Sequence, residues 1–137
     1  MHGSFDERAA TWDDDPAKVE RASEVARAIR AAVPLGPAAR LLEYGAGTGL
    51  VSQFLRDAVG PVTLADTSAG MRRVLHDKIA AGVPVGARVW DVDLATGPVP
   101  HDRFDLIVTV MALHHIAAVD TVLAAFAELA TPGGHLC

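Results

Sequence analysis

The sequence contains a single cysteine, Cys137, and few basic residues. No disulfide can form within the chain, so we expect a reducing compartment and a cytoplasmic location. Only 12 Lys and Arg stand against 17 Asp and Glu, and they form no cluster. We therefore expect no nucleic-acid partner, because a basic surface that follows phosphates is missing.

Long hydrophobic runs are also missing. The longest, from Leu106 to Leu113, is interrupted by Thr109 and is too short to span a bilayer. The first ten residues carry no basic region followed by an apolar segment, so we expect neither a secretory signal nor a membrane partner. The histidines outside motifs show no metal-ligand spacing, so no metal site is expected. A content of 50% hydrophobic and 21% charged residues predicts one globular domain.

The most informative stretch is LLEYGAGTGL, Leu41 to Leu50, in which an apolar run ends in Glu43 and three glycines follow at every second position. This pattern predicts a strand, a tight turn and a helix that begins near Thr48 or Gly49. The glycines let the backbone approach a ligand closely, and the first amides of the helix would face an anionic group. The dinucleotide-binding version of such a loop has its third glycine one position later, where this chain has Leu50.

A second predicted strand, residues 62–65, ends at Asp66, about twenty residues after the first glycine. At this spacing a nucleotide-binding βαβ unit places a carboxylate that accepts two hydrogen bonds from a ribose diol. The alternative is that Asp66 caps the helix that follows, and the two roles are compatible.

Hydrophobic spacing predicts the remaining elements. Asp15 and Pro16 start a helix, and residues 104–111 form a nearly continuous buried strand, as in the centre of a parallel sheet. We expect helices over 16–33, 50–58 and 71–79 and a third strand over 88–94. A further helix is expected to start at Asp120 or Thr121 and to end at the TPGG of residues 131–134.

Taken in order, these motifs resemble the class I S-adenosylmethionine-dependent methyltransferases of the small-molecule type. The resemblance rests on GxGxG after an acid, DTSAGM from Asp66, and FDLIV followed by ALHHI, and it extends from Phe5 to Gly134. It implies an α/β fold with a Rossmann-like, doubly wound and mostly parallel sheet. The family's sheet has seven strands, so we expect this one to be incomplete after the start of the fifth strand. We expect the fourth strand to have only a stub beside it, and a homo-oligomer to form through the exposed edge.

The resemblance also implies S-adenosyl-L-methionine as the cofactor. An acid after the third strand would accept a hydrogen bond from the exocyclic amine of adenine. Asp93 is preferred, because it lies at the family's usual distance before FDLIV, and Asp91 is the reserve. The Leu94 NH would donate to a ring nitrogen. Either aspartate could instead lie in an exposed loop. The cofactor-binding residues expected on this basis are Glu43, Gly45, Ala46, Gly47, Gly49, Asp66, Thr67, Met71, Asp91, Asp93, Leu94 and Met111.

His114 and His115 are the histidines that the motif places at the active edge, and either could act as a general base. The alternative is that they only orient their loop. Residues 1–37 are expected to form a helical segment that covers the cofactor site, and residues 38–137 the cofactor-binding core. Phe5 and Trp12 would belong to the cover, although Trp12 could equally pack on the sheet.

The function implied is direct in-line transfer of a methyl group to a small-molecule O, N or C nucleophile. Two alternatives stay open. One is a non-catalytic fragment or paralogue that binds S-adenosylmethionine and acts with a partner. The other is an NAD-dependent oxidoreductase, against which Leu50 and Glu43 both argue.

Overall fold

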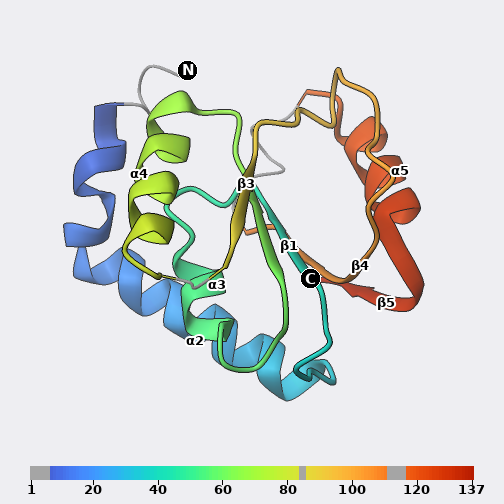
Figure 1. Cartoon of the computed structure of the whole chain (residues 1–137), viewed down its shortest axis with the longest axis horizontal. Coiled ribbons are helices and arrows are strands. Elements are labelled where there is room, and N and C mark those ends of the chain that lie inside the picture. The colour runs from blue at the N-terminus through green and yellow to red at the C-terminus, as the bar shows by residue number, and fades with distance from the viewer. Residues whose placement is uncertain (1–6, 84–85, 111–116) are drawn as a thin grey trace.

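The structure, a computed structural model, describes residues 7–83, 86–110 and 117–137. Five strands form one parallel sheet in the order β3-β2-β1-β4-β5. The strands are β1 (Leu41–Tyr44), β2 (Val62–Ala65), β3 (Arg88–Trp90), β4 (Phe104–Val108) and β5 (Ala130–Leu136). Helices lie on both sides of the sheet (Figure 1), which confirms the predicted doubly wound α/β fold.

The two faces of the sheet have separate cores because successive strand side chains point to opposite sides. On one face, Leu41 and Leu106 belong to a core with residues of α2 (Pro16–Ala32), α3 (Leu50–Leu55) and α4 (Ala69–Ala80). On the other, Leu42 and Ile107 pack with α5 (Val119–Leu129). None of the described helices is long and apolar enough to cross a membrane.

The N-terminal part of the chain confirms the predicted helix start. The Asp15 carboxylate accepts a hydrogen bond of 2.9 Å from the Ala17 amide, and Pro16 occupies the first turn of α2. Before α2, a 3-10 helix that was not predicted, η1 (Ala9–Asp14), lies beside α4 (Figure 1). Residues far apart in the sequence therefore meet on the outer side of α4.

Two predicted strands are too long. β3 ends at Trp90 rather than Leu94, because a turn begins at Asp93, whose carboxylate accepts from the Ala95 amide and whose carbonyl accepts from the Gly97 amide. Aspartate favours such local hydrogen bonds over a strand ladder. β4 ends at Val108, and its predicted last residue, Met111, lies outside the described residues.

The helix predicted over 50–58 ends at Leu55, and Ala58 lies in the following turn, where its amide donates to the Leu55 carbonyl. The last helix, α5, ends at Leu129, with only Ala130 before TPGG, as predicted, and TPGG itself lies inside β5. Thr131 precedes Pro132, and a residue before proline avoids the helical region.

β5 also corrects the expectation that β4 has only a stub beside it. After an irregularity at 131–134, Leu106 pairs with His135 and Ile107 with Leu136. The ladder continues through hydrogen bonds of 2.9 Å from the Cys137 amide to Ile107 and from the Thr109 amide to Cys137. The edge of the sheet on this side is therefore β5.

The strand order places the ligand-binding edge. The chain runs outward from β1 to β2 and β3, and then returns to place β4 on the other side of β1. Open α/β sheets bind ligands at the carboxyl ends of their strands where the order reverses in this way. The glycine-rich loop after β1 lies at this reversal.

Candidate cofactor-binding site

The loop of residues 45–49 joins β1 to α3 and has the backbone geometry that its glycines predict. Gly45, Gly47 and Gly49 have φ angles of 71°, 60° and 75°, which residues with side chains rarely adopt. The amides of Gly45 and Ala46 donate to the Ala65 carbonyl at 2.8 and 2.9 Å, so the end of β2 holds the start of the loop. Helix α3 begins directly after Gly49, close to the predicted position.

The carboxylate of Asp66 lies against this loop. One of its oxygens accepts a hydrogen bond of 2.8 Å from the Gly47 amide, and the other accepts one of 2.8 Å from the Ser68 amide. Ser68 in turn caps α4, because its hydroxyl accepts from the Met71 amide at 3.2 Å. The structure thus brings together the acid at the end of β2 and the glycine loop at the end of β1.

Glu43 is buried on the α3 side of β1, with 3% of its surface exposed. Its Oε1 accepts hydrogen bonds from the Ser52 hydroxyl at 2.6 Å and from the Ser52 amide at 3.1 Å. Burial raises the pKa of Glu43 to about 7, although both hydrogen bonds from Ser52 act to lower it. The Glu43 carboxyl therefore anchors the first turn of α3 and titrates near neutral pH.

On the other face of β1, the Tyr44 hydroxyl accepts a hydrogen bond of 2.9 Å from the Leu94 amide. The NH that sequence analysis assigned to an adenine ring nitrogen thus has a partner within the chain. Asp93 is half-buried, and its carboxylate caps the turn at Ala95, whereas Asp91 is exposed. Both aspartates follow β3 rather than ending it, and Asp93 directly precedes Leu94, whose amide donates to the Tyr44 hydroxyl.

Two hollows adjoin these residues. A small cavity of about 110 Å³ lies between the glycine loop and the N-terminal segment. Its lining comprises Trp12, Lys18, Arg21, Ala22, Val25, Glu43, Gly45, Ala46, Gly47, Thr48, Leu50, Val51 and Val110. A larger, mostly apolar hollow of about 460 Å³ lies in the segment after β3 and is lined by Val92, Asp93, Gly97, Pro98, Val99, Pro100 and His101.

Other predicted site residues have less contact with this region. Met71 is 2% exposed and therefore belongs to the core, whereas Thr67 is exposed beside Asp66. Met111, His114 and His115 lie outside the described residues, as does Phe5. Among the described residues, no group of three acidic, His or Cys side chains could hold a metal ion.

Tyr44 and Ser52, the partners of Leu94 and Glu43, were not among the predicted site residues. Ser52 does carry a signal: it is a polar residue among the apolar positions of a short helix, and it is completely buried. Since buried polar groups need hydrogen-bond partners, the acid of the preceding strand was a reasonable candidate. Tyr44 carries no comparable signal, because a tyrosine at a strand end usually packs as an aromatic residue.

Comparisons with known proteins agree with this geometry. The Methyltransferase domain family matches residues 17–137. Uncharacterized methyltransferases of Mycobacterium bovis and Mycobacterium tuberculosis are 36% identical to this chain over 108 residues, which cover 79% of this chain and 53% of each relative. The chain therefore spans about half the length of the curated relatives it matches.

Solved structures show the same fold. The S-adenosylmethionine-bound amino pentose methyltransferase of Micromonospora echinaspora has a TM-score of 0.68 and 27% identity, over 85% of this chain and 48% of that chain. A methyltransferase of Thiobacillus denitrificans in complex with S-adenosyl-L-homocysteine has a TM-score of 0.66 and 25% identity, over 85% of this chain and 46% of that chain. With the family match over nearly all of its residues, this chain belongs to the class I S-adenosylmethionine-dependent methyltransferases, as its motifs predicted.

Proposed function

We infer that this chain binds S-adenosyl-L-methionine at the glycine loop and takes part in transferring its methyl group to a small-molecule O, N or C nucleophile. One observation carries the proposal: the Asp66 carboxylate lies 2.8 Å from the Gly47 amide. A ribose held by Asp66 would therefore have the amino-acid tail of the same ligand beside residues 45–49. This agrees with relatives whose structures contain S-adenosylmethionine or S-adenosylhomocysteine.

The shape of the loop fits such a ligand. A Cβ atom added to Gly47 would meet no atom within 4 Å, so the backbone borders open space at this point. Gly45, Ala46 and Gly47 also line the small cavity, where none of the three carries a side chain larger than a methyl group to cover its backbone. In this proposal Asp66 orients the ribose, and Gly45 to Gly49 hold the amino-acid tail.

The adenine ring is assigned to the residues after β3. Asp93, on the margin of the larger hollow, would accept the exocyclic amine, and Asp91 remains the reserve. The hydrogen bond between Leu94 and Tyr44 makes the Leu94 NH a weaker candidate for a ring nitrogen, because that contact would first have to break. Tyr44 instead holds the backbone beside Asp93 in place.

The chemistry asks the protein mainly for placement. S-adenosylmethionine, when bound, supplies a methyl group that is already activated on a sulfonium with a neutral leaving group. Holding the acceptor in line with that methyl can contribute on the order of 7–11 kcal/mol through orientation alone. A general base is needed only where the acceptor must lose a proton, and His114 or His115 is our candidate for that role.

The N-terminal segment, residues 1–37, is proposed to cover the cofactor, with residues 38–137 as the binding core. Trp12 supports this division, because it lines the small cavity together with residues of the glycine loop. It also packs against the core cluster beneath α2, so the two predicted roles of Trp12 are compatible.

Calorimetric titration with S-adenosylhomocysteine tests the cofactor assignment. We expect wild-type chain to bind it and not NAD, and Asp66→Ala to weaken binding by at least about tenfold, since a hydrogen bond to a charged group is lost. Asp93→Ala should weaken binding more than Asp91→Ala. Binding of NAD alone, or unchanged affinity in Asp66→Ala, would contradict the proposal.

A non-catalytic binding role is the second candidate, because the chain spans about half the length of its curated relatives. Incubation with labelled S-adenosylmethionine and a metabolite extract distinguishes the two. Label that moves to a metabolite, and fails to move with Asp66→Ala, supports an enzyme. Binding without transfer supports a cofactor-binding module that acts with a partner.

A further inference from the structure

A network of charged and polar groups joins η1, the glycine loop and α4. The Asp13 carboxylate, at the end of η1, accepts a hydrogen bond from the Thr48 hydroxyl through one oxygen and forms an ion pair with Lys78 of α4 through the other. Lys78 also donates to the Thr48 carbonyl at 2.7 Å and to the Gln53 side chain at 3.3 Å. We call Asp13, Thr48 and Lys78 the loop clasp.

The clasp is well shielded and its geometry is specific. The side chains of Lys78 and Asp13 are 19% and 32% exposed, and Thr48 is 2% exposed. An ammonium has three donors, and the three acceptors of Lys78 come from η1, the loop and α3. Such an ion pair is less screened by solvent than those on the surface, so its loss should have a measurable effect.

Both polar groups of Thr48 are held by the clasp, its hydroxyl by Asp13 and its carbonyl by Lys78. Thr48 lies between Gly47 and Gly49, the two glycines with positive φ in the second half of the loop. Fixing Thr48 therefore restricts the backbone between two glycines, which by themselves allow many conformations.

The clasp also fixes η1. Trp12, next to Asp13, lines the small cavity with Gly45 and Gly47, and the Lys18 ammonium lies 4.4 Å from the centre of its ring. Because Trp12 adjoins Asp13, the contacts of Asp13 with Thr48 and Lys78 also hold Trp12 against the small cavity. The docking of η1 through Asp13 and the conformation of residues 45–49 should therefore depend on each other.

We propose that Asp13 and Lys78 are positioning residues: they clamp Thr48, keep the glycine loop in its ligand-binding shape, and couple the docking of η1 to the binding of the cofactor. This inference rests on the proposed function for the identity of the ligand, an adenosyl amino acid. Neither side chain needs to contact that ligand. Because coupling is reciprocal, ligand binding should also stabilise the docked position of η1.

The test combines titration with S-adenosylhomocysteine and hydrogen exchange. Lys78→Met and Asp13→Asn should each weaken binding by about tenfold, within the range usual for coupled sites. The double variant should be little weaker than either single one, since both break the same unit, and Lys78→Arg should recover part of the affinity. In the ligand-free chain, Lys78→Met should speed exchange at residues 45–49 and in η1.

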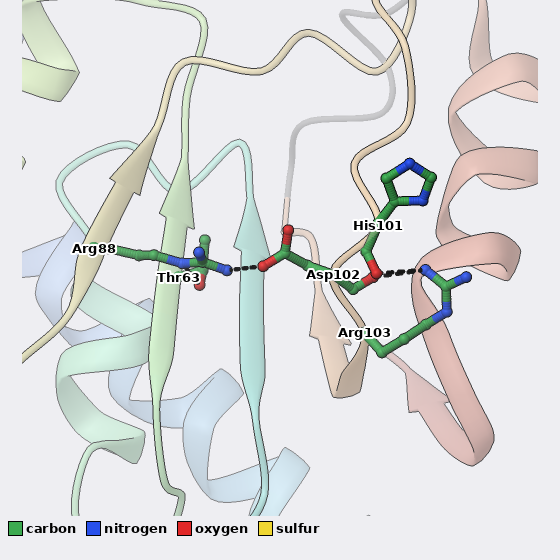
Figure 2. Close-up of polar contacts among 5 residues, drawn as sticks. All are labelled: Thr63, Arg88, His101, Asp102 and Arg103. Atoms are coloured by element: carbon green, nitrogen blue, oxygen red, sulfur yellow. Dashed lines mark hydrogen bonds and ion pairs between the residues drawn. The ribbon is translucent and has the colours of Figure 1, made fainter.

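Arg88→Met is the matched control. Arg88 also joins three segments, donating to Thr63 of β2 at 2.9 Å and pairing with Asp102 before β4 (Figure 2). It lies at the start of β3, whereas the glycine loop lies at the carboxyl ends of the parallel strands, two strands away. Removing this cation should change stability without changing affinity or exchange in the loop.

The outcomes separate the two proposals. If wild-type chain binds S-adenosylhomocysteine and the clasp variants bind it equally well, or if their losses add in the double variant, the clasp proposal is overturned. If wild-type chain binds none, the proposed function fails together with the claim about affinity. Hydrogen exchange still decides that case: unchanged exchange at residues 45–49 in Lys78→Met overturns the positioning role.

Discussion

Glu43 is an ionisable group in a place where charge is costly, and this should make the stability of the chain depend on pH. Burial raises the pKa of Glu43 from 4.5 to about 7 in the folded chain. A raised pKa contributes stability that is full below the unfolded value, 4.5, and is lost as pH rises through about 7. The shift corresponds to on the order of 3 kcal/mol between these limits.

We therefore expect the free energy of unfolding of wild-type chain, relative to Glu43→Gln, to fall between pH 5 and pH 8. Urea denaturation at the two pH values measures this difference. Glu128→Gln, which removes an exposed carboxylate from α5, controls for the loss of one charge. Parallel pH profiles for wild type and Glu43→Gln would show that Glu43 does not titrate in this range.

Residue types in the motifs predicted which groups lie close together. They did not predict which of these groups bond to another part of the chain and which are left for a ligand. The acid and the glycines near the ends of the first two strands indicated that Asp66 and Gly47 lie together, and they do. Whether the hydrogen-bond partner of a group lies in the chain or in a ligand depends on burial and on the course of the loops, which the residue types of a motif do not show. The Leu94 amide, taken by Tyr44, is the clearest example.

At the scale of elements, the glycine loop has two glycines whose substitution should have different effects. Gly49 has a positive φ, and an added Cβ would meet Leu75 and Leu64 side chains at 3.0 and 3.4 Å. Gly49→Ala should therefore lower the free energy of unfolding by roughly 1–3 kcal/mol, from backbone strain and core contact together.

Gly47 has the same kind of φ but borders open space. Gly47→Ala should lower stability by only about 1–2 kcal/mol, as expected for strain alone, yet strongly weaken S-adenosylhomocysteine binding. Gly86 is the control, because it has a φ of +73° and no atom near its Cβ position. Thermal unfolding and titration together check this: Gly47→Ala and Gly86→Ala should match in stability and differ in binding. Equal binding would show that the ligand does not approach Gly47.

Elements with strong periodicity were predictable, and their ends were not. β2 was predicted residue for residue, and α2 from its Asp15 cap and its buried Ala22, Ala26 and Ile29. The errors lie where local hydrogen bonds compete with the hydrophobic pattern, as with Asp93 after β3 and the turn at Ala58 after α3. The clasp was not predicted, because Asp13 and Lys78 are ordinary surface residues in sequence and meet only through the fold.

For the whole molecule, the sheet has two unequal edges. β3 is three residues long and starts with the charged Arg88, whereas β5 is seven residues long and carries the half-exposed Leu136. Long edge strands with exposed apolar residues tend to pair with other chains, and charges on an edge oppose this. The prediction of a homo-oligomer through the exposed edge therefore concerns β5.

We expect the wild-type chain to self-associate through β5 and Leu136→Lys to weaken that association by several-fold, because a lysine on the edge strand opposes pairing. Sedimentation velocity over a range of protein concentrations measures both. Leu123→Lys is the matched control, because Leu123 is also an exposed large hydrophobic residue in the described part of the chain, at 38%, and lies on α5 instead of the edge. Equal weakening by Leu136→Lys and Leu123→Lys would indicate non-specific apolar association. A wild-type chain that stays monomeric would contradict self-association through β5.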